Sequence, residues 1–459
     1  MAGIGFALRD LSRHDNMSSS LRSYTYAAFV ACGPWIFTVL ALGGITWIGR
    51  RTMQSGDLAT FFVIVTYNFS ISLVISGPIV MVVTRLLADK LFLKQVDEVP
   101  GILLGSLVLL LSIQASVGIA FYGFVVDLST IERVLAIICF LLVGSIWLAS
   151  VFLSALKCFQ VIGGAFVFGM SVAFISTTVL SEVYGAAGAL AGFTGGLALV
   201  LFILIPRIFA EYPYPISRPF GFLGAFRTYW EFAFAGLLYN AAVWIDKWVM
   251  WLSPEAKVYA GAMAAFPAYD GGMFLAYLTI VPAMAIFVVA LETKFFVSYR
   301  RYFDDIGNHA TFDQIERNHA SIVHVIGLAF RNVVVLQGVV CYLAILVAPR
   351  FISAAPGGLE MIPIFQIGTL SAFLHILFLF ALIIISYFDL RGTLLTVSVV
   401  FFISNATFTG ATLLLGYEFY GYGYFSSVLV SLAVAYSMAA KSIGRLPYMT
   451  FVANNRGLR

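Results

Sequence analysis

Twelve long apolar runs alternate with short polar connections along the chain. Each run is about 20 residues or longer, the length that a helix needs to cross the hydrocarbon of a bilayer. A membrane barrel would use much shorter strands, so the runs predict helices, which satisfy their own backbone groups in lipid. The runs occupy residues 24–49, 58–87, 100–126, 134–156, 161–180, 186–208, 229–252, 260–290, 321–348, 361–387, 393–416 and 424–443.

The composition narrows the class of protein. Hydrophobic residues make up 61% of the 459 residues and charged residues 10%, whereas a soluble domain carries about 25% charged residues. These values exclude a water-soluble enzyme, a disordered protein and a nucleic-acid-binding domain. Twelve spans also leave no room for a large soluble domain. The sequence therefore predicts an all-α polytopic membrane protein with about 12 transmembrane helices.

Basic residues predict how the chain is oriented in the membrane. With twelve spans, the termini and the even-numbered connections hold 19 Lys and Arg residues, against 5 in the opposite connections. Because cytoplasmic connections are rich in Lys and Arg, we expect both termini to be cytoplasmic. The first 23 residues carry Ile4, Leu8 and Leu11 on one helical face, which predicts a short amphipathic helix at that surface.

The spans divide into two lobes. Six spans precede a stretch rich in proline and aromatic residues at 209–228, and six follow it. We predict an N-lobe at 1–228, which includes this stretch as a linker, and a C-lobe at 229–459. A docking role for the stretch is the alternative. Pro78 and Pro282 each precede a lysine by twelve residues, which suggests two six-helix repeats of parallel topology.

Ionisable residues inside apolar runs are costly, so they are the first candidates for function. Asp246 and Lys247 lie in the seventh run and Asp270 in the eighth. Neighbours on a helix point about 100° apart, so we expect Asp246 and Lys247 not to face each other. Asp270, about 15 Å deep if its helix begins at 260, is a candidate partner for Lys247. The alternative is that Lys247 extends to the membrane surface.

Other residues offer several interpretations. Arg331 is deep if its span begins near Ser321 and at the membrane edge if it begins near Val333. A lone His375 is typical of a satisfied helix contact. Gly-Pro pairs at 33–34 and 77–78 favour kinks that assist packing, and glycines spaced four apart in the sixth run favour close helix packing. The latter are Gly188, Gly192 and Gly196.

We predict no metal site, no cofactor and no disulfide framework from the four cysteines.

Several motifs resemble the inner-membrane exporters of the Pel exopolysaccharide (the PelG family). They run through nearly the whole chain and are most specific around Asp246 and Asp270. They comprise Gly3–Ile4–Gly5–Phe6, Leu8–Arg9, Gly33–Pro34–Trp35, Tyr239–Asn240, Trp244 with Asp246–Lys247, Trp251 with Ser253–Pro254, Tyr269–Asp270, Leu275–Ala276–Tyr277–Leu278 and Glu292–Thr293.

The resemblance implies a flippase-like fold of the multidrug/oligosaccharidyl-lipid/polysaccharide superfamily, with two six-helix lobes around a central cavity. It implies export of a galactosamine-type polysaccharide through the bacterial inner membrane. It also implies partners: a cytosolic glycosyltransferase and membrane proteins that sense cyclic-di-GMP. On this hypothesis Asp246, Lys247 and Asp270 line the substrate path. Trp244, Tyr269 and Tyr277 would contact sugar rings there, and Arg331 would join them if it lies deep.

Two other functions compete with export. A cation-coupled antiporter of small molecules on the same fold would use Asp270 as a protonatable carboxylate. An integral-membrane glycosyltransferase would need clustered carboxylates at the membrane face, and Asp304–Asp305 in the long 291–320 connection is the one candidate pair. That connection could instead dock a cytosolic partner or be a solvated amphipathic segment.

Overall fold

The protein was analysed as a computed structural model that describes residues 17–155, 158–354 and 357–453. The predicted amphipathic helix of the first 23 residues lies largely outside the described residues. Contacts group the chain into two compact units. We call Gly33–Phe266 the N-unit, and Pro267–Arg459 with the start of the chain up to Cys32 the C-unit. The division into lobes at residue 228 stays a prediction.

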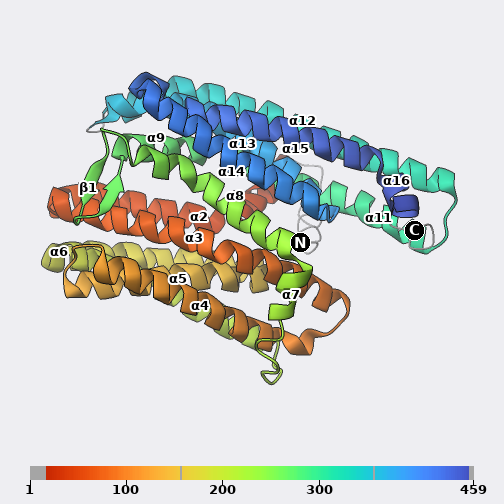
Figure 1. The fold of residues 1–459 in the computed structure, drawn as a ribbon, viewed down its shortest axis with the longest axis horizontal. Coiled ribbons are helices and arrows are strands. Elements are labelled where there is room, and N and C mark those ends of the chain that lie inside the picture. The colour runs from red at the N-terminus through yellow and green to blue at the C-terminus, as the bar shows by residue number, and fades with distance from the viewer. Residues whose placement is uncertain (1–16, 156–157, 355–356, 454–459) are drawn as a thin grey trace. The chain divides into compact units, whose positions relative to one another are not determined.

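The N-unit is a helical bundle followed by a small hairpin (Figure 1). Its core is α3, which packs against α4, α5, α6 and α8. The elements are α2 (Met17–Thr52, which begins in the C-unit), α3 (Ser55–Phe92), the 3-10 helix η1 (Val96–Glu98), α4 (Val99–Phe124), α5 (Thr130–Ala155), α6 (Phe159–Glu211), α7 (Leu223–Thr228), α8 (Trp230–Met250), β1 (Lys257–Tyr259) and β2 (Met263–Ala265).

The C-unit is a second helical bundle in which α13 is the most buried helix and packs against α9, α12 and α15. The elements are α9 (Pro267–Leu278), α10 (Val281–Ala290), the π-helical turn η2 (Leu291–Phe295), α11 (Phe296–Gly307), α12 (Phe312–Ile352), α13 (Gly358–Tyr387), α14 (Arg391–Leu415), η3 (Tyr417–Phe419), α15 (Tyr422–Gly444), α16 (Leu446–Tyr448) and η4 (Met449–Ala453).

The helices agree with the predicted membrane class. Among the described residues, 10 helices are long and apolar enough to cross a membrane. One of them, α6, holds both the fifth and the sixth predicted runs, joined at a kink. The seventh run is α8, which is not among the ten because Asp246 and Lys247 lower its mean hydropathy. The chain is thus a multi-pass membrane protein.

The kink in α6 is a turn that only glycine accommodates well. Gly185 has φ 56° and ψ −134°, and a Cβ there would lie 2.5 Å from Oδ2 of Asp57. After it the chain returns along itself, because a Cβ on Gly192 would lie 2.3 Å from the backbone nitrogen of Thr177. A Cβ on Gly196 would lie 2.6 Å from the carbonyl oxygen of Gly169. The predicted close packing of the glycine stripe is confirmed.

This turn provides a test of the fold. Replacing Gly185 by Ala should destabilise the protein by about 1–3 kcal/mol, because alanine is strained at this backbone conformation and also meets Asp57. Gly164→Ala is the matched control in the same helix, since nothing lies within 4 Å of a Cβ there. Thermal unfolding of the purified variants in detergent measures both. Equal unfolding temperatures would contradict the described turn.

A glycine pair also joins α3 to α8. A Cβ on Gly77 would lie 2.8 Å from the carbonyl oxygen of Gly236, and the reverse distance is 2.8 Å as well. Asn240 donates a hydrogen bond to the carbonyl of Leu73 at 3.1 Å, close to the Pro78 interruption of α3. The Gly77–Pro78 pair therefore serves close packing, as the sequence predicts.

A buried glutamine occurs in the corresponding place of each unit. Gln114 on α4 donates to the hydroxyl of Ser72 at 2.9 Å, and Gln337 on α12 donates to the hydroxyl of Thr279 at 3.4 Å. Both glutamines are fully buried. In each case the third predicted span of a half contacts the second. This shared contact is what two parallel repeats would produce.

Candidate functional site

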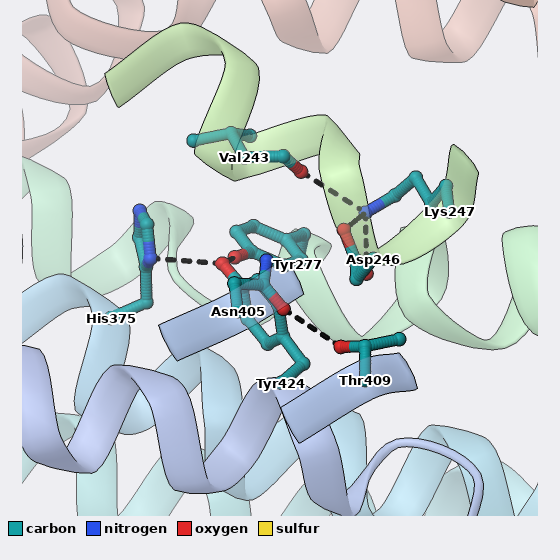
Figure 2. Close-up of polar contacts among 8 residues, drawn as sticks. All are labelled: Val243, Asp246, Lys247, Tyr277, His375, Asn405, Thr409 and Tyr424. Carbon is teal, nitrogen blue, oxygen red and sulfur yellow. Dashed lines mark hydrogen bonds and ion pairs between the residues drawn. The ribbon is translucent and has the colours of Figure 1, made fainter. Parts of the chain in front are cut away.

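The N-unit holds a buried ion pair on α8. The Asp246 side chain is 0% exposed and that of Lys247 is 12% exposed. The ammonium nitrogen of Lys247 lies 3.1 Å from each carboxylate oxygen of Asp246, and 3.4 Å from the carbonyl oxygen of Val243 (Figure 2). Burial of both charges requires such pairing, because an isolated charge in an apolar interior is very costly.

This pair corrects the expectation that neighbouring Asp246 and Lys247 cannot face each other. The expectation considered only the directions of the two Cα–Cβ bonds, which diverge by about 100°. The lysine has a long flexible stem, and its ammonium group bends back to the preceding carboxylate. The ammonium group is held at Asp246, and extension of Lys247 to the membrane surface stays an alternative prediction.

Trp244 completes the cluster on α8. The ammonium nitrogen of Lys247 lies 5.5 Å from the centre of the Trp244 ring, within the range of a cation–π contact. The Nε1 donor of Trp244 is buried and has no hydrogen-bond partner among the described residues. The cluster thus combines a carboxylate acceptor, an ammonium donor, an aromatic face and an unused N–H donor.

The C-unit holds a polar chain that connects three helices. The hydroxyl of Tyr277 on α9 is hydrogen-bonded to that of Tyr424 on α15, which lies 3.0 Å from Nδ1 of His375 on α13 (Figure 2). His375 is 4% exposed, so the prediction of a satisfied helix contact is confirmed. Nearby on α14, the hydroxyl of Thr409 donates to the side-chain oxygen of Asn405 at 2.8 Å.

Asp270 lies nearer the start of its helix than the sequence predicts. Residues 257–265 form an antiparallel hairpin, in which Lys257 pairs with Ala265, rather than the first turns of a helix. Asp270 is therefore in the first turn of α9, about 4–5 Å from the start of the helix. The positive end of the helix dipole favours a carboxylate there. Its pairing with Lys247, which belongs to the other unit, stays a prediction.

The hairpin explains this error. Its turn at Ala260 and Gly261 has φ values of 45° and 76°, which end any helix, but this turn and the apolar second strand, Met263–Ala265, fall inside the predicted run at 260–290. The hairpin is held within the N-unit because the hydroxyl of Tyr67 donates to the carbonyl of Ala264 at 2.9 Å. The backbone N–H of Asp127 also donates to the carbonyl of Ala260 at 2.9 Å.

The remaining predicted residues are placed as follows. Tyr269 is fully buried, and Tyr277 is partly buried in its chain with Tyr424. Arg331 is exposed on α12, a helix that begins at Phe312 and continues unbroken past both starts considered for its span. Roles for these three residues along a substrate path stay predictions. Tyr424, which links Tyr277 to His375, was not predicted, since a tyrosine in an apolar run has no distinguishing signal.

Asp305 of the Asp304–Asp305 pair connects two helices. Asp305 accepts hydrogen bonds from the amides of Asn318 at 2.6 Å and Gln314 at 3.3 Å, which connects α11 to α12. Asp304 pairs with Arg300 at 3.3 Å on the same helix. The two carboxylates thus have structural partners.

Solved structures with the same fold are transporters. An outward-facing multidrug resistance MATE family transporter of the MOP superfamily has a TM-score of 0.67 at 12% identity, with 96% of this chain and 98% of that chain covered. A MOP superfamily transporter from Pyrococcus furiosus, described as having a binding pocket of reverse polarity, has a TM-score of 0.65 at 12% identity, with 92% and 95% covered. A MATE structure in the straight conformation has a TM-score of 0.63 at 13% identity, with 94% and 96% covered.

The structural similarity shows that this chain has the predicted MATE-like fold. At such low sequence identity it does not show that the chain exports drugs. A search of curated proteins finds no match. A family model does match, over residues 1–451. It is the PelG model, described as "Putative exopolysaccharide Exporter (EPS-E)".

Proposed function

This chain belongs to the PelG family of exopolysaccharide exporters, and from that membership we propose that it carries an exopolysaccharide from the cytoplasm to the periplasm. The observation that carries the proposal is the family match over almost the entire length of a chain that has a transporter fold. The membrane is the inner membrane of a bacterium, and both termini are cytoplasmic, as the distribution of basic residues favours.

The proposed substrate is a Pel-like polymer of the galactosamine type. Such a polymer presents hydroxyl groups, apolar ring faces and, where it lacks acetyl groups, ammonium groups. The α8 cluster offers a complementary group to each: Asp246 accepts from hydroxyl or ammonium groups, Trp244 offers a ring face and an N–H donor, and Lys247 donates. Asp270, Tyr269, Tyr277 and Arg331 are proposed as further parts of the path.

The protein breaks and forms no covalent bond in this proposal. A cytosolic glycosyltransferase makes the polymer, and membrane proteins that sense cyclic-di-GMP regulate its synthesis. The driving force is either an ion gradient or polymer synthesis itself. These two differ in a simple way, because synthesis-driven export continues when the membrane potential and pH gradient are dissipated.

Inverted membrane vesicles test the proposal. The cognate glycosyltransferase and this protein are present together, labelled sugar nucleotide is supplied outside, and the fraction of polymer protected from an added glycosidase is measured. Protection should depend on this protein. Asp270→Ala should abolish protection while the protein stays folded, and Asp304→Ala, at an exposed carboxylate outside the proposed path, should leave it unchanged.

Two outcomes would contradict this proposal. Polymer that is made but remains unprotected, with the protein shown to be folded, would exclude export. Efflux of small cations from proteoliposomes that depends on a pH gradient would then favour the antiporter hypothesis. Full protection with Asp270→Ala would remove Asp270 from the path and leave the exporter function in place.

A further inference from the structure

A proline-rich strap crosses the beginning of α4. We define the strap as residues 212–222, between α6 and α7 (Figure 1). A Cβ on Gly101 would lie 1.9 Å from the carbonyl oxygen of Ser217, and one on Gly105 would lie 1.6 Å from that of Pro219. The backbone of the strap therefore lies directly on the helix backbone. It is a seated segment rather than a loose connection between lobes.

Both ends of the strap are anchored inside the protein. Tyr212 and Phe222 are buried. Burial raises the pKa of the Tyr212 phenol to about 12, with a further contribution from the Glu211 carboxylate. Between the anchors the chain turns at Arg218, which has φ 44°, and the N–H of Gly221 donates to the Arg218 carbonyl at 2.9 Å. The strap thus has one defined conformation.

The middle of the strap points apolar side chains outward. Tyr214, Ile216 and Phe220 are 42%, 52% and 52% exposed. The same end of the N-unit, where α3 and α6 end and α4 and α8 begin, exposes further apolar and basic side chains. These are Phe92, Leu93, Leu223 and Trp230, with Lys94, Arg218 and Arg227. Large apolar side chains together with Arg and Lys are typical of the water–membrane interface.

The depth of the strap agrees with such a location. α4 has 26 residues and is therefore about 39 Å long, about 9 Å more than the hydrocarbon thickness. If the excess is shared between its two ends, the hydrocarbon begins about 4–5 Å from the start of α4. Gly101 and Gly105 lie about 3 Å and 9 Å from that start, one on each side of the boundary.

We propose that the strap, with the exposed residues beside it, is an interfacial anchor that binds anionic phospholipid. Tyr214, Ile216 and Phe220 enter the boundary between headgroups and acyl chains, and Arg218 and Arg227 contact the phosphates. A cytosolic protein that recognises proline-rich segments is the competing occupant. The depth of Gly101 and Gly105 favours lipid, because a strap at this level is covered by headgroups.

Spin labels report the environment of the strap in the full-length protein. The background variant carries Cys158→Ser, since Cys158 is the partly exposed one of the four cysteines and the others are buried. A nitroxide at Ile216→Cys in vesicles should be more accessible to oxygen than to a water-soluble nickel chelate. Val108→Cys, exposed on the apolar middle of α4, is the lipid control, and Gln314→Cys, on the polar start of α12, is the aqueous control. Accessibility at Ile216 like that at Gln314 would overturn the proposal and favour a protein partner.

Charge provides an independent second readout. Adding phosphatidylglycerol to the detergent-solubilised protein should raise its unfolding temperature more than phosphatidylcholine does. Arg218→Asn keeps a residue that tolerates the left-handed φ of 44° but removes the charge. It should weaken the apparent affinity for phosphatidylglycerol about fivefold. Arg301→Asn, on α11 of the other unit, should not change the affinity. Equal effects of the two lipids on the parent protein would contradict the anionic site.

Discussion

Replacing Lys247 by Met should lower the stability of the protein by about 3–5 kcal/mol. The Asp246 carboxylate is 0% exposed and lies 3.1 Å from the lysine nitrogen, so loss of the ammonium group leaves a buried charge without its close counter-charge. Methionine keeps the length of the stem and removes only the charge. Thermal unfolding in detergent measures the loss, and removal of both charges in Asp246→Asn with Lys247→Met should restore much of it.

A surface pair provides the control for this prediction. Arg300 and Asp304 lie 3.3 Å apart with side chains that are 67% and 57% exposed. Exposed pairs contribute little, so Arg300→Met should leave the unfolding temperature nearly unchanged. A similarly small change for Lys247→Met would mean that Asp246 is solvated, and the described burial would be wrong.

The double variant also separates structure from transport. If the pair only stabilises α8, a folded protein with Asp246→Asn and Lys247→Met exports polymer normally. If the carboxylate and ammonium groups contact the polymer, the same folded protein protects none of it in the vesicle experiment. Our proposal requires the second result, and normal export by the double variant would remove both residues from the path.

The membrane class and the spans could be predicted because they depend on the strongest signal in the sequence. Apolar runs of span length have no other stable arrangement in lipid. The errors lie where apolar residues continue without a break from one structural element into the next. The hairpin turn and its apolar second strand at 260–265 could not be distinguished from a helix start, so Asp270 was placed too far along its helix. Without φ values, the turn at Ala260–Gly261 is only an alanine and a glycine among others.

The candidate site was predicted in part, for a related reason. A charge inside an apolar run reveals that a residue is costly, and Asp246 and Lys247 were found in this way. Their partners depend on side-chain reach and on helix contacts, which a single sequence does not contain. The two links of the Tyr277–Tyr424–His375 chain join residues that are 147 and 49 positions apart, and no spacing rule connects them. Prolines at 213, 215 and 219 predicted a linker, and its close contact with Gly101 and Gly105 could not be predicted from them.

Replacing Gly192 by Ala should destabilise the protein by about 1–3 kcal/mol, and replacement by Val should cost more. A Cβ at this position would lie 2.3 Å from the Thr177 nitrogen and 2.5 Å from the Ser176 carbonyl carbon, and neither backbone atom can rotate away as a side chain can. The Ser176 hydroxyl also donates to the Gly192 carbonyl at 3.0 Å, so separating the two helices loses that hydrogen bond as well.

The neighbouring glycine is a nearly ideal control for this prediction. Gly195 lies three residues further along the same helix, it is exposed, and nothing lies within 4 Å of a Cβ there. Gly195→Ala should therefore stabilise the helix, by up to about 1 kcal/mol, because alanine has the higher helix propensity. Opposite signs for the two variants follow only if one face of this helix meets a neighbouring backbone and the other does not. Two changes of the same sign would show that the return of α6 along itself is wrongly described.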